Sequence, residues 1–97
     1  HTASIFAGPD LNKALDAPKA RRAVGVRPDP LPPEAPVARV TLTRAALLSS
    51  RTLIITITGA EKRKLLEQAI ADGQSSRLPI GRVLAEAEQP IDIHWAP

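Results

Sequence analysis

The sequence predicts an α/β fold in which helices flank a mostly parallel sheet. Segments with strand patterns alternate along the chain with segments that have the apolar periodicity of helices. One strand segment, LIITIT at 53–58, is nearly continuous in apolar residues, which is typical of a strand buried on both faces of a parallel sheet. Only four short strands are predicted, so we expect residues outside this chain to complete the sheet.

The first half of the chain predicts a helix, two strands and a short helix, in that order. Segment 2–6 has small polar residues followed by apolar ones, a pattern that can open a helix. AVGVRP at 23–28 and ARVTLT at 38–43 combine small and branched residues, so each predicts a strand. The proline-rich segment 27–36 between them predicts an extended surface loop, and RAALLSS at 44–50 predicts a short helix.

The second half predicts a strand, two helices and a closing strand. The strand at 53–58 ends at Gly59, and the next helix runs from Ala60 to Gly73, where glycine terminates it. A second helix starts near Pro79, and IDIHWAP at 91–97 predicts the closing strand. The apolar stripe of the first helix consists of Leu65, Leu66, Ala69 and Ile70. One face of the closing strand carries Ile91, Ile93 and Trp95.

Composition favours a soluble protein and disfavours several other classes. The 97 residues are 43% hydrophobic and 24% charged, which is typical of one small globular domain or part of a larger one. No apolar run reaches the ~18 residues of a membrane span, and cysteine and a cationic leader are absent, so we expect a cytoplasmic protein without membrane contacts. The net charge is +3, but Phe6 and Trp95 are the only aromatic residues, so nucleic-acid binding is not expected.

Two cations are candidates for binding an anion such as phosphate. Lys62 falls in the first turn of the predicted helix after Gly59, where the helix dipole disfavours a positive charge. A phosphate between the helix end and Lys62 would explain this placement, although a solvated helix face shared with Arg63 and Lys64 is an alternative. Arg39 likewise is either a phosphate ligand or an exposed cation on its strand.

The two histidines receive different interpretations. His1 precedes short hydroxyl side chains, and its neutral imidazole could take a proton from water. His94 lies opposite Ile93 in an alternating strand, which indicates a structural or solvent-facing histidine.

Five segments carry a more specific signal. They are HTASIFAG at 1–8, ARVTLT at 38–43, TGAEKRKLLEQAI at 58–70, LPIGRVL at 78–84 and IHWAP at 93–97. In this order they resemble motifs in the C-terminal half of the 6-phosphogluconolactonases, whose wider family includes glucosamine-6-phosphate deaminases. Ala7 stands where that family commonly has proline, and the family's glycine-rich lead-in to the first motif is absent.

The resemblance implies a three-layer sandwich of which residues 1–97 are the C-terminal portion of a single lactonase domain. It implies hydrolysis of 6-phosphoglucono-δ-lactone to 6-phosphogluconate, with His1 as the general base and with Arg39 and Lys62 as ligands of the substrate phosphate. No cofactor and no metal are expected. The N-terminal half of the domain is the expected partner, and without it we expect the 97-residue chain to be inactive.

Two other functions stay open from the sequence. The sister chemistry of the family is isomerisation or deamination of an amino-sugar phosphate. A small basic α/β module could also bind phosphorylated metabolites or RNA without turning them over. No cysteine is present, and no serine has the glycine spacing of a nucleophile elbow, so a covalent acyl-enzyme is not expected.

Overall fold

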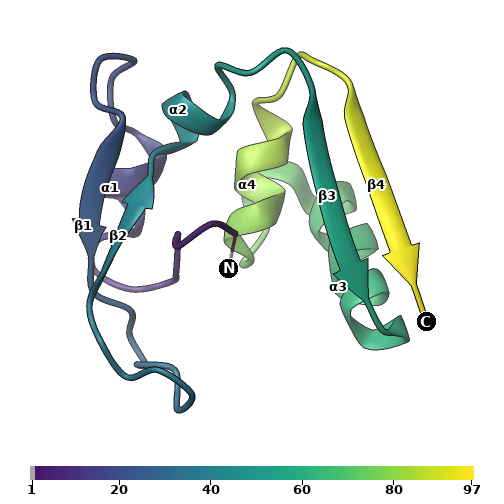
Figure 1. Cartoon of the computed structure of the whole chain (residues 1–97), viewed down its shortest axis with the longest axis horizontal. Coiled ribbons are helices and arrows are strands. Elements are labelled where there is room, and N and C mark those ends of the chain that lie inside the picture. The colour runs from purple at the N-terminus through teal and green to yellow at the C-terminus, as the bar shows by residue number, and fades with distance from the viewer. Residues whose placement is uncertain (1) are drawn as a thin grey trace. The chain divides into compact units, whose positions relative to one another are not determined.

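A computed structural model describes residues 2–97 of the chain (Figure 1). The chain forms two compact units, the first ending at Ser49 and the second running from Ser50 to Pro97. None of the helices within residues 2–97 has the length and apolar character that crossing a membrane requires.

The first unit contains two short helices and an antiparallel pair of strands. Its elements are α1 (Leu11–Leu15), β1 (Ala23–Val26), β2 (Arg39–Leu42) and α2 (Arg44–Leu47). Strands β1 and β2 pair with Ala23 opposite Leu42 and Val26 opposite Arg39. Both predicted strands and the short helix after them are confirmed, and segment 27–36 is a loop as predicted.

The helix predicted to open at segment 2–6 is wrong. Thr2 and Ile5 instead close a tight turn, in which the Ile5 amide donates to the Thr2 carbonyl at 2.8 Å and the Thr2 amide donates back at 3.3 Å. Ala3 adopts a left-handed φ of 47°, which a helix does not allow. The turn buries Ile5 completely, so tertiary packing outweighs the local preference for a helix.

Helix α2 begins where it does because Thr43 caps it. The Thr43 hydroxyl accepts a hydrogen bond from the Ala46 amide at 3.1 Å, as an N-cap residue does. The same hydroxyl donates to the Arg21 carbonyl at 2.7 Å, just before β1. Thr43 is completely buried, so its hydroxyl joins the end of β2, the start of α2 and the approach to β1.

The second unit contains a parallel strand pair with two helices on one face. Its elements are β3 (Leu53–Thr58), α3 (Ala60–Asp72), the 3₁₀ turn η1 (Gly73–Ser75), α4 (Pro79–Ala85) and β4 (Ile91–Ala96). The register runs from Leu53 beside Ile91 to Thr58 beside Ala96. Helices α3 and α4 lie together on the same side of this pair (Figure 1). All four predicted elements of this half are confirmed.

Strand β3 is not buried on both faces within the described residues. Leu53, Ile55 and Ile57 are half-buried, whereas the alternating residues are exposed and Ile54 keeps 66% of its surface accessible. The reason is that α3 and α4 cover only one face of the β3–β4 pair. The apolar run therefore behaves as an alternating strand, with Thr56 and Thr58 on its open face.

Helices α3 and α4 pack against each other through buried apolar residues and a close backbone contact at Gly81. Leu66 and Ala69 of α3 are buried, as is Val83 of α4, while Leu65 and Ile70 of the predicted stripe remain about half exposed. At Gly81 the α4 backbone approaches so closely that a Cβ atom would lie 2.5 Å from the Ser76 Cβ and 2.7 Å from the Ala69 carbonyl oxygen. Only glycine fits this contact without a shift of the backbone.

We therefore expect Gly81→Ala to lower the free energy of unfolding by about 1–3 kcal/mol, the usual cost of overpacking. Chemical denaturation of the complete protein measures the change. Gly25→Ala is the matched control, because a Cβ there meets nothing closer than the Arg39 carbonyl oxygen at 3.9 Å. Equal stability of the two variants would contradict the close approach of α3 and α4.

Candidate active site

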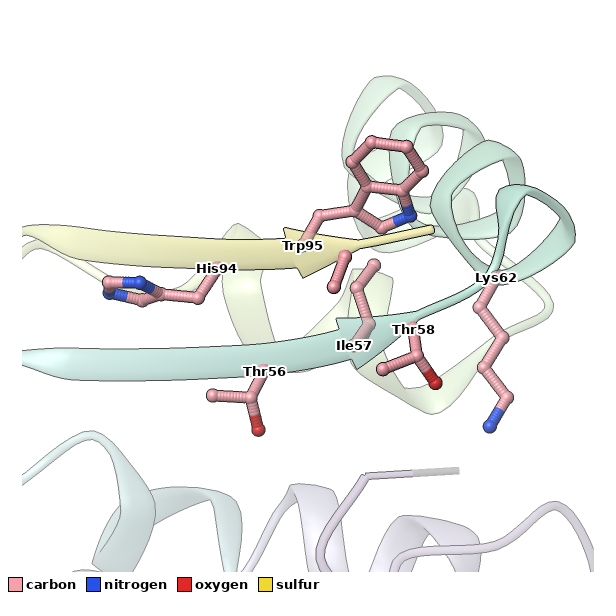
Figure 2. A pocket seen from close by; sticks show the side chains of 7 residues that line it. Thr56, Ile57, Thr58, Lys62, His94 and Trp95 are labelled. Carbon is pink, nitrogen blue, oxygen red and sulfur yellow. The ribbon is translucent and has the colours of Figure 1, made fainter.

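A solvent-open hollow lies at the carboxyl ends of β3 and β4 (Figure 2). Its volume is about 380 Å³. Polar and apolar residues from both strands and from α3 line it: Thr56, Ile57, Thr58, Lys62, His94, Trp95 and Ala96. In open α/β sheets, ligands bind at this end of the strands, so the hollow is a candidate site for this chain.

The hollow presents groups that can hold an anion. The side chains of Thr56, Thr58 and Lys62 point to the same side of β3 (Figure 2). Thr56 pairs in register with His94 on β4, which brings an imidazole to the same hollow. Hydroxyl, ammonium and imidazole groups all donate hydrogen bonds to phosphate or carboxylate oxygens.

Lys62 reaches the hollow because the chain turns sharply at Gly59. The turn gives Gly59 a φ of 88°, a conformation that residues with a Cβ rarely adopt. Helix α3 begins at the next residue, so Lys62 lies in its first turn, as the sequence predicted. Among residues 2–97 no side chain caps this helix end, and its free amides add positive potential beside Lys62.

Arg39 is held more firmly than an exposed strand cation would be. Its guanidinium lies 4.5 Å from the centroid of the Phe6 ring, and its Nη2 donates to the Ala35 carbonyl at 2.7 Å. Its Nη1 is buried and has no hydrogen-bond partner within residues 2–97. Arg39 also lines a hollow of the first unit together with Ser4, Phe6 and Glu34. The Arg39 guanidinium is thus fixed in position, and its Nη1 can still donate a hydrogen bond.

His1, the predicted general base, lies outside the described residues, but the segment that follows it is well fixed. The Ser4 amide donates to the Thr41 hydroxyl at 3.1 Å, and that hydroxyl donates to the Leu42 carbonyl at 2.9 Å. Thr41 is 3% exposed. A buried hydroxyl on β2 therefore anchors the turn directly after His1.

Sequence reasoning missed four residues of the hollow at β3 and β4. They are Thr56, Thr58, His94 and Trp95. The two threonines, spaced by two in an otherwise apolar strand, were a usable signal for a polar face. Their proximity to His94 follows only from the parallel register, which the sequence does not specify. Within residues 2–97, no group of three His, Cys, Asp or Glu side chains could hold a metal ion.

Comparison with known proteins identifies the family. The model of the family described as glucosamine-6-phosphate isomerases/6-phosphogluconolactonase matches residues 1–95. The chain belongs to this family. Two curated members are the 6-phosphogluconolactonases of Rhizobium meliloti and Mesorhizobium japonicum, which are 35% and 37% identical to this chain over 98 and 101 residues.

Solved structures of family members have the same fold. A 6-phosphogluconolactonase from Shewanella baltica matches with a TM-score of 0.81 and 31% identity, covering 100% of this chain and 40% of that one. The enzyme from Trypanosoma cruzi matches with a TM-score of 0.71 and 31% identity, covering 99% of this chain and 34% of that one. The matches to the Rhizobium and Mesorhizobium proteins cover 100% of this chain but only 40% and 39% of those proteins. It thus spans about two fifths of these relatives.

The anchor at Thr41 leads to a prediction about stability. Thr41→Val keeps the shape of the side chain but leaves the Ser4 amide without its acceptor, so we expect a loss of ~1–3 kcal/mol in the free energy of unfolding. Thr52→Val, on the exposed approach to β3, is the control and should change stability little. Denaturant titration of the complete protein measures both. A Thr41→Val variant as stable as the wild type would show that the anchor contributes nothing.

Proposed function

We propose that the protein hydrolyses 6-phosphoglucono-δ-lactone to 6-phosphogluconate. The observation that carries this proposal is the similarity of the whole chain, at 30–37% identity, to proteins named 6-phosphogluconolactonase. The five motif segments and the hollow at the carboxyl ends of β3 and β4 support it. We also propose that the protein is cytoplasmic.

His1 is the proposed general base of this reaction. A lactone is an activated ester, so a positioned water molecule and one base are sufficient to open it. The base takes a proton from water as the oxygen attacks the lactone carbonyl, and the ring oxygen leaves with a proton to give the free acid. The motif HTAS at the start of the chain supports this assignment. The mechanism requires neither a metal nor an organic cofactor.

Lys62 and Arg39 are the proposed ligands of the substrate phosphate. Lys62 lines the hollow beside two threonines, and its first-turn position places it next to free helix amides. Arg39 has one buried nitrogen without a partner in the described residues, and a phosphate oxygen would satisfy such a donor. Holding the remote phosphate keeps the reacting carbonyl in place, which converts binding energy into rate.

Amino-sugar-phosphate isomerisation is the second candidate, because the matching family model includes glucosamine-6-phosphate isomerases. The names of the similar proteins favour the lactonase. Incubation with glucosamine 6-phosphate separates the two functions. Release of ammonia, which isomerisation coupled to deamination produces, would support the second candidate and would overturn the lactonase proposal.

Removal of the imidazole tests the proposed base. In the complete protein, His1→Ala should lower kcat for the lactone by roughly 10²- to 10⁴-fold, the usual contribution of a general base. Rates need correction for the spontaneous hydrolysis of the substrate, and Asn12→Ala on the exposed side of α1 serves as a control. Unchanged turnover by His1→Ala would show that another group activates the water.

Removal of the ammonium tests the proposed phosphate site. Lys62→Ala should raise KM by roughly 10- to 100-fold, because a charge-assisted hydrogen bond to the phosphate is lost. Lys64→Ala, two residues along α3 and away from the lining of the hollow, removes the same charge and should leave KM nearly unchanged. An equal rise in KM for both variants would indicate a general electrostatic effect and no specific contact at Lys62.

A further inference from the structure

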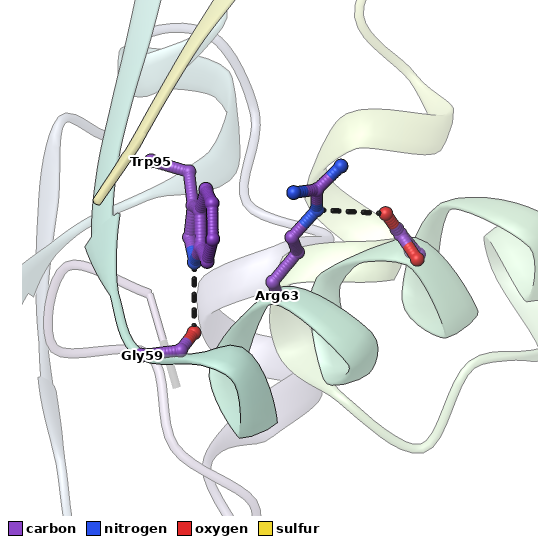
Figure 3. Close-up of polar contacts among 4 residues, drawn as sticks. Gly59, Arg63 and Trp95 are labelled. Atoms are coloured by element: carbon purple, nitrogen blue, oxygen red, sulfur yellow. Dashed lines mark hydrogen bonds and ion pairs between the residues drawn. The ribbon is translucent and has the colours of Figure 1, made fainter. Parts of the chain in front are cut away.

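Gly59, which turns the chain from β3 into α3, is hydrogen-bonded to the end of β4 through both of its backbone polar groups, and Figure 3 shows the bond to its carbonyl. The Trp95 indole Nε1 donates to the Gly59 carbonyl at 2.9 Å. The Gly59 amide donates to the Ala96 carbonyl, also at 2.9 Å. The Gly59 carbonyl further accepts from the Arg63 amide at 3.3 Å, which is the first bond of the helix.

Arg63 contacts the face of the same indole ring. Its guanidinium carbon lies 4.6 Å from the centroid of the Trp95 ring, within the range of a cation–π interaction. Its Nε donates to the Glu67 carboxylate at 3.2 Å, one turn further along α3. Glu67, Arg63, Trp95 and Gly59 thus form a continuous chain of contacts (Figure 3), which we call the indole latch.

We infer that Trp95 and Arg63 are positioning residues for Lys62. The inference rests on the proposed function, in which Lys62 binds the substrate phosphate. Trp95 lines the hollow and Arg63 does not, but the role inferred for both is to position Lys62 and not to contact the substrate. They act by fixing the turn at Gly59 and the first turn of α3, and thereby the direction from which the Lys62 side chain enters the hollow.

The conformation of Gly59 explains why such a latch is needed. Glycine has the largest backbone freedom of any residue, and no side chain in the described part of the chain caps the helix that follows it. A Cβ at Gly59 would meet nothing within 4 Å among residues 2–97, so no packing contact on that side of the residue restricts the turn. The bonds from Trp95 and Ala96 therefore restrain it, together with the helix bond from the Arg63 amide. An unrestrained turn would let Lys62 sample other directions, and the entropy lost on binding phosphate would rise.

Within residues 2–97 the latch lies at the surface, where a purely structural contact contributes little. Trp95 retains 37% exposure, and the Arg63 side chain retains 52%. Surface contacts of this kind stabilise a fold weakly, because water competes for the same groups. We expect the contacts of the indole latch to orient the turn at Gly59. Their loss should therefore change substrate binding more than the free energy of unfolding.

The test compares two latch variants with a control in the complete protein. Trp95→Phe keeps a ring for Arg63 but lacks the N–H that binds Gly59, and Arg63→Gln removes the cation. Each should raise KM for 6-phosphoglucono-δ-lactone by roughly 3- to 10-fold, the range expected for one lost hydrogen bond, with kcat within about twofold. Lys64→Gln removes a neighbouring charge outside the latch and should change neither constant.

A double-mutant cycle with Lys62→Ala separates positioning from structural support. If the latch acts through Lys62, Trp95→Phe should have no further effect on KM once Lys62 is alanine. An equal effect of Trp95→Phe in both backgrounds would overturn the inference, as would a KM that Trp95→Phe leaves unchanged. Thermal melting of each variant checks that the fold is retained.

Failure of the proposed function gives a different result. If the wild type does not hydrolyse the lactone, the lactonase proposal falls, and titration with inorganic phosphate then tests the latch by itself. Weaker phosphate binding by Trp95→Phe and Arg63→Gln than by Lys64→Gln would support the latch, and equal binding by all three would overturn it. Lactone turnover with a KM insensitive to Lys62→Ala would overturn the latch and leave the lactonase proposal standing.

Discussion

The parallel pairing of β3 with β4 is the constraint on which the second unit depends. Two parallel strands cannot be joined by a short hairpin, so the chain must cross back between them through α3 and α4. The crossing covers one face of the pair and leaves the other to Thr56, Thr58 and His94. It also brings the carboxyl ends of both strands to one edge, directly beside the first turn of α3. The hollow and the position of Lys62 are consequences of this single topological choice.

Local chemistry made most of the helices and strands predictable. Pro79 at the start of α4 and Gly73 at the end of α3 are short-range signals, and the structure confirms both. The segment around Thr2 and Ile5 was mispredicted because a buried isoleucine and paired backbone groups overrode its helix-like composition. Ile54 is 66% exposed within residues 2–97, and the burial of β3 on both faces stays a prediction that depends on residues outside this chain. A run of apolar residues does not say how many faces of a strand the rest of the chain will cover.

The candidate site likewise has one part that the sequence predicts and one part that only the structure shows. A strand, a glycine and a cation in sequence were enough to predict Lys62 near a helix N-terminus. The pairing of Thr56 with His94 depends on register, and the stacking of Arg39 on Phe6 depends on how a turn and a strand from distant parts of the chain meet. No periodic pattern in the sequence predicts either contact. The residues of the site could therefore be proposed singly, but their grouping required the structure.

The contacts give the family motifs a physical meaning. The segment around Gly59 and the closing segment are far apart in sequence, yet the Trp95 indole joins them through one hydrogen bond. The opening segment and the β2 segment are likewise joined, through Ser4 with Thr41 and through Phe6 with Arg39. These four segments form two contacting pairs, and each pair contains a cation proposed to bind phosphate. Because these segments meet in space, changing a residue in one of them removes the contact partner of a residue in the other. Their joint presence in the sequence therefore constrains the geometry of the fold as well as its composition.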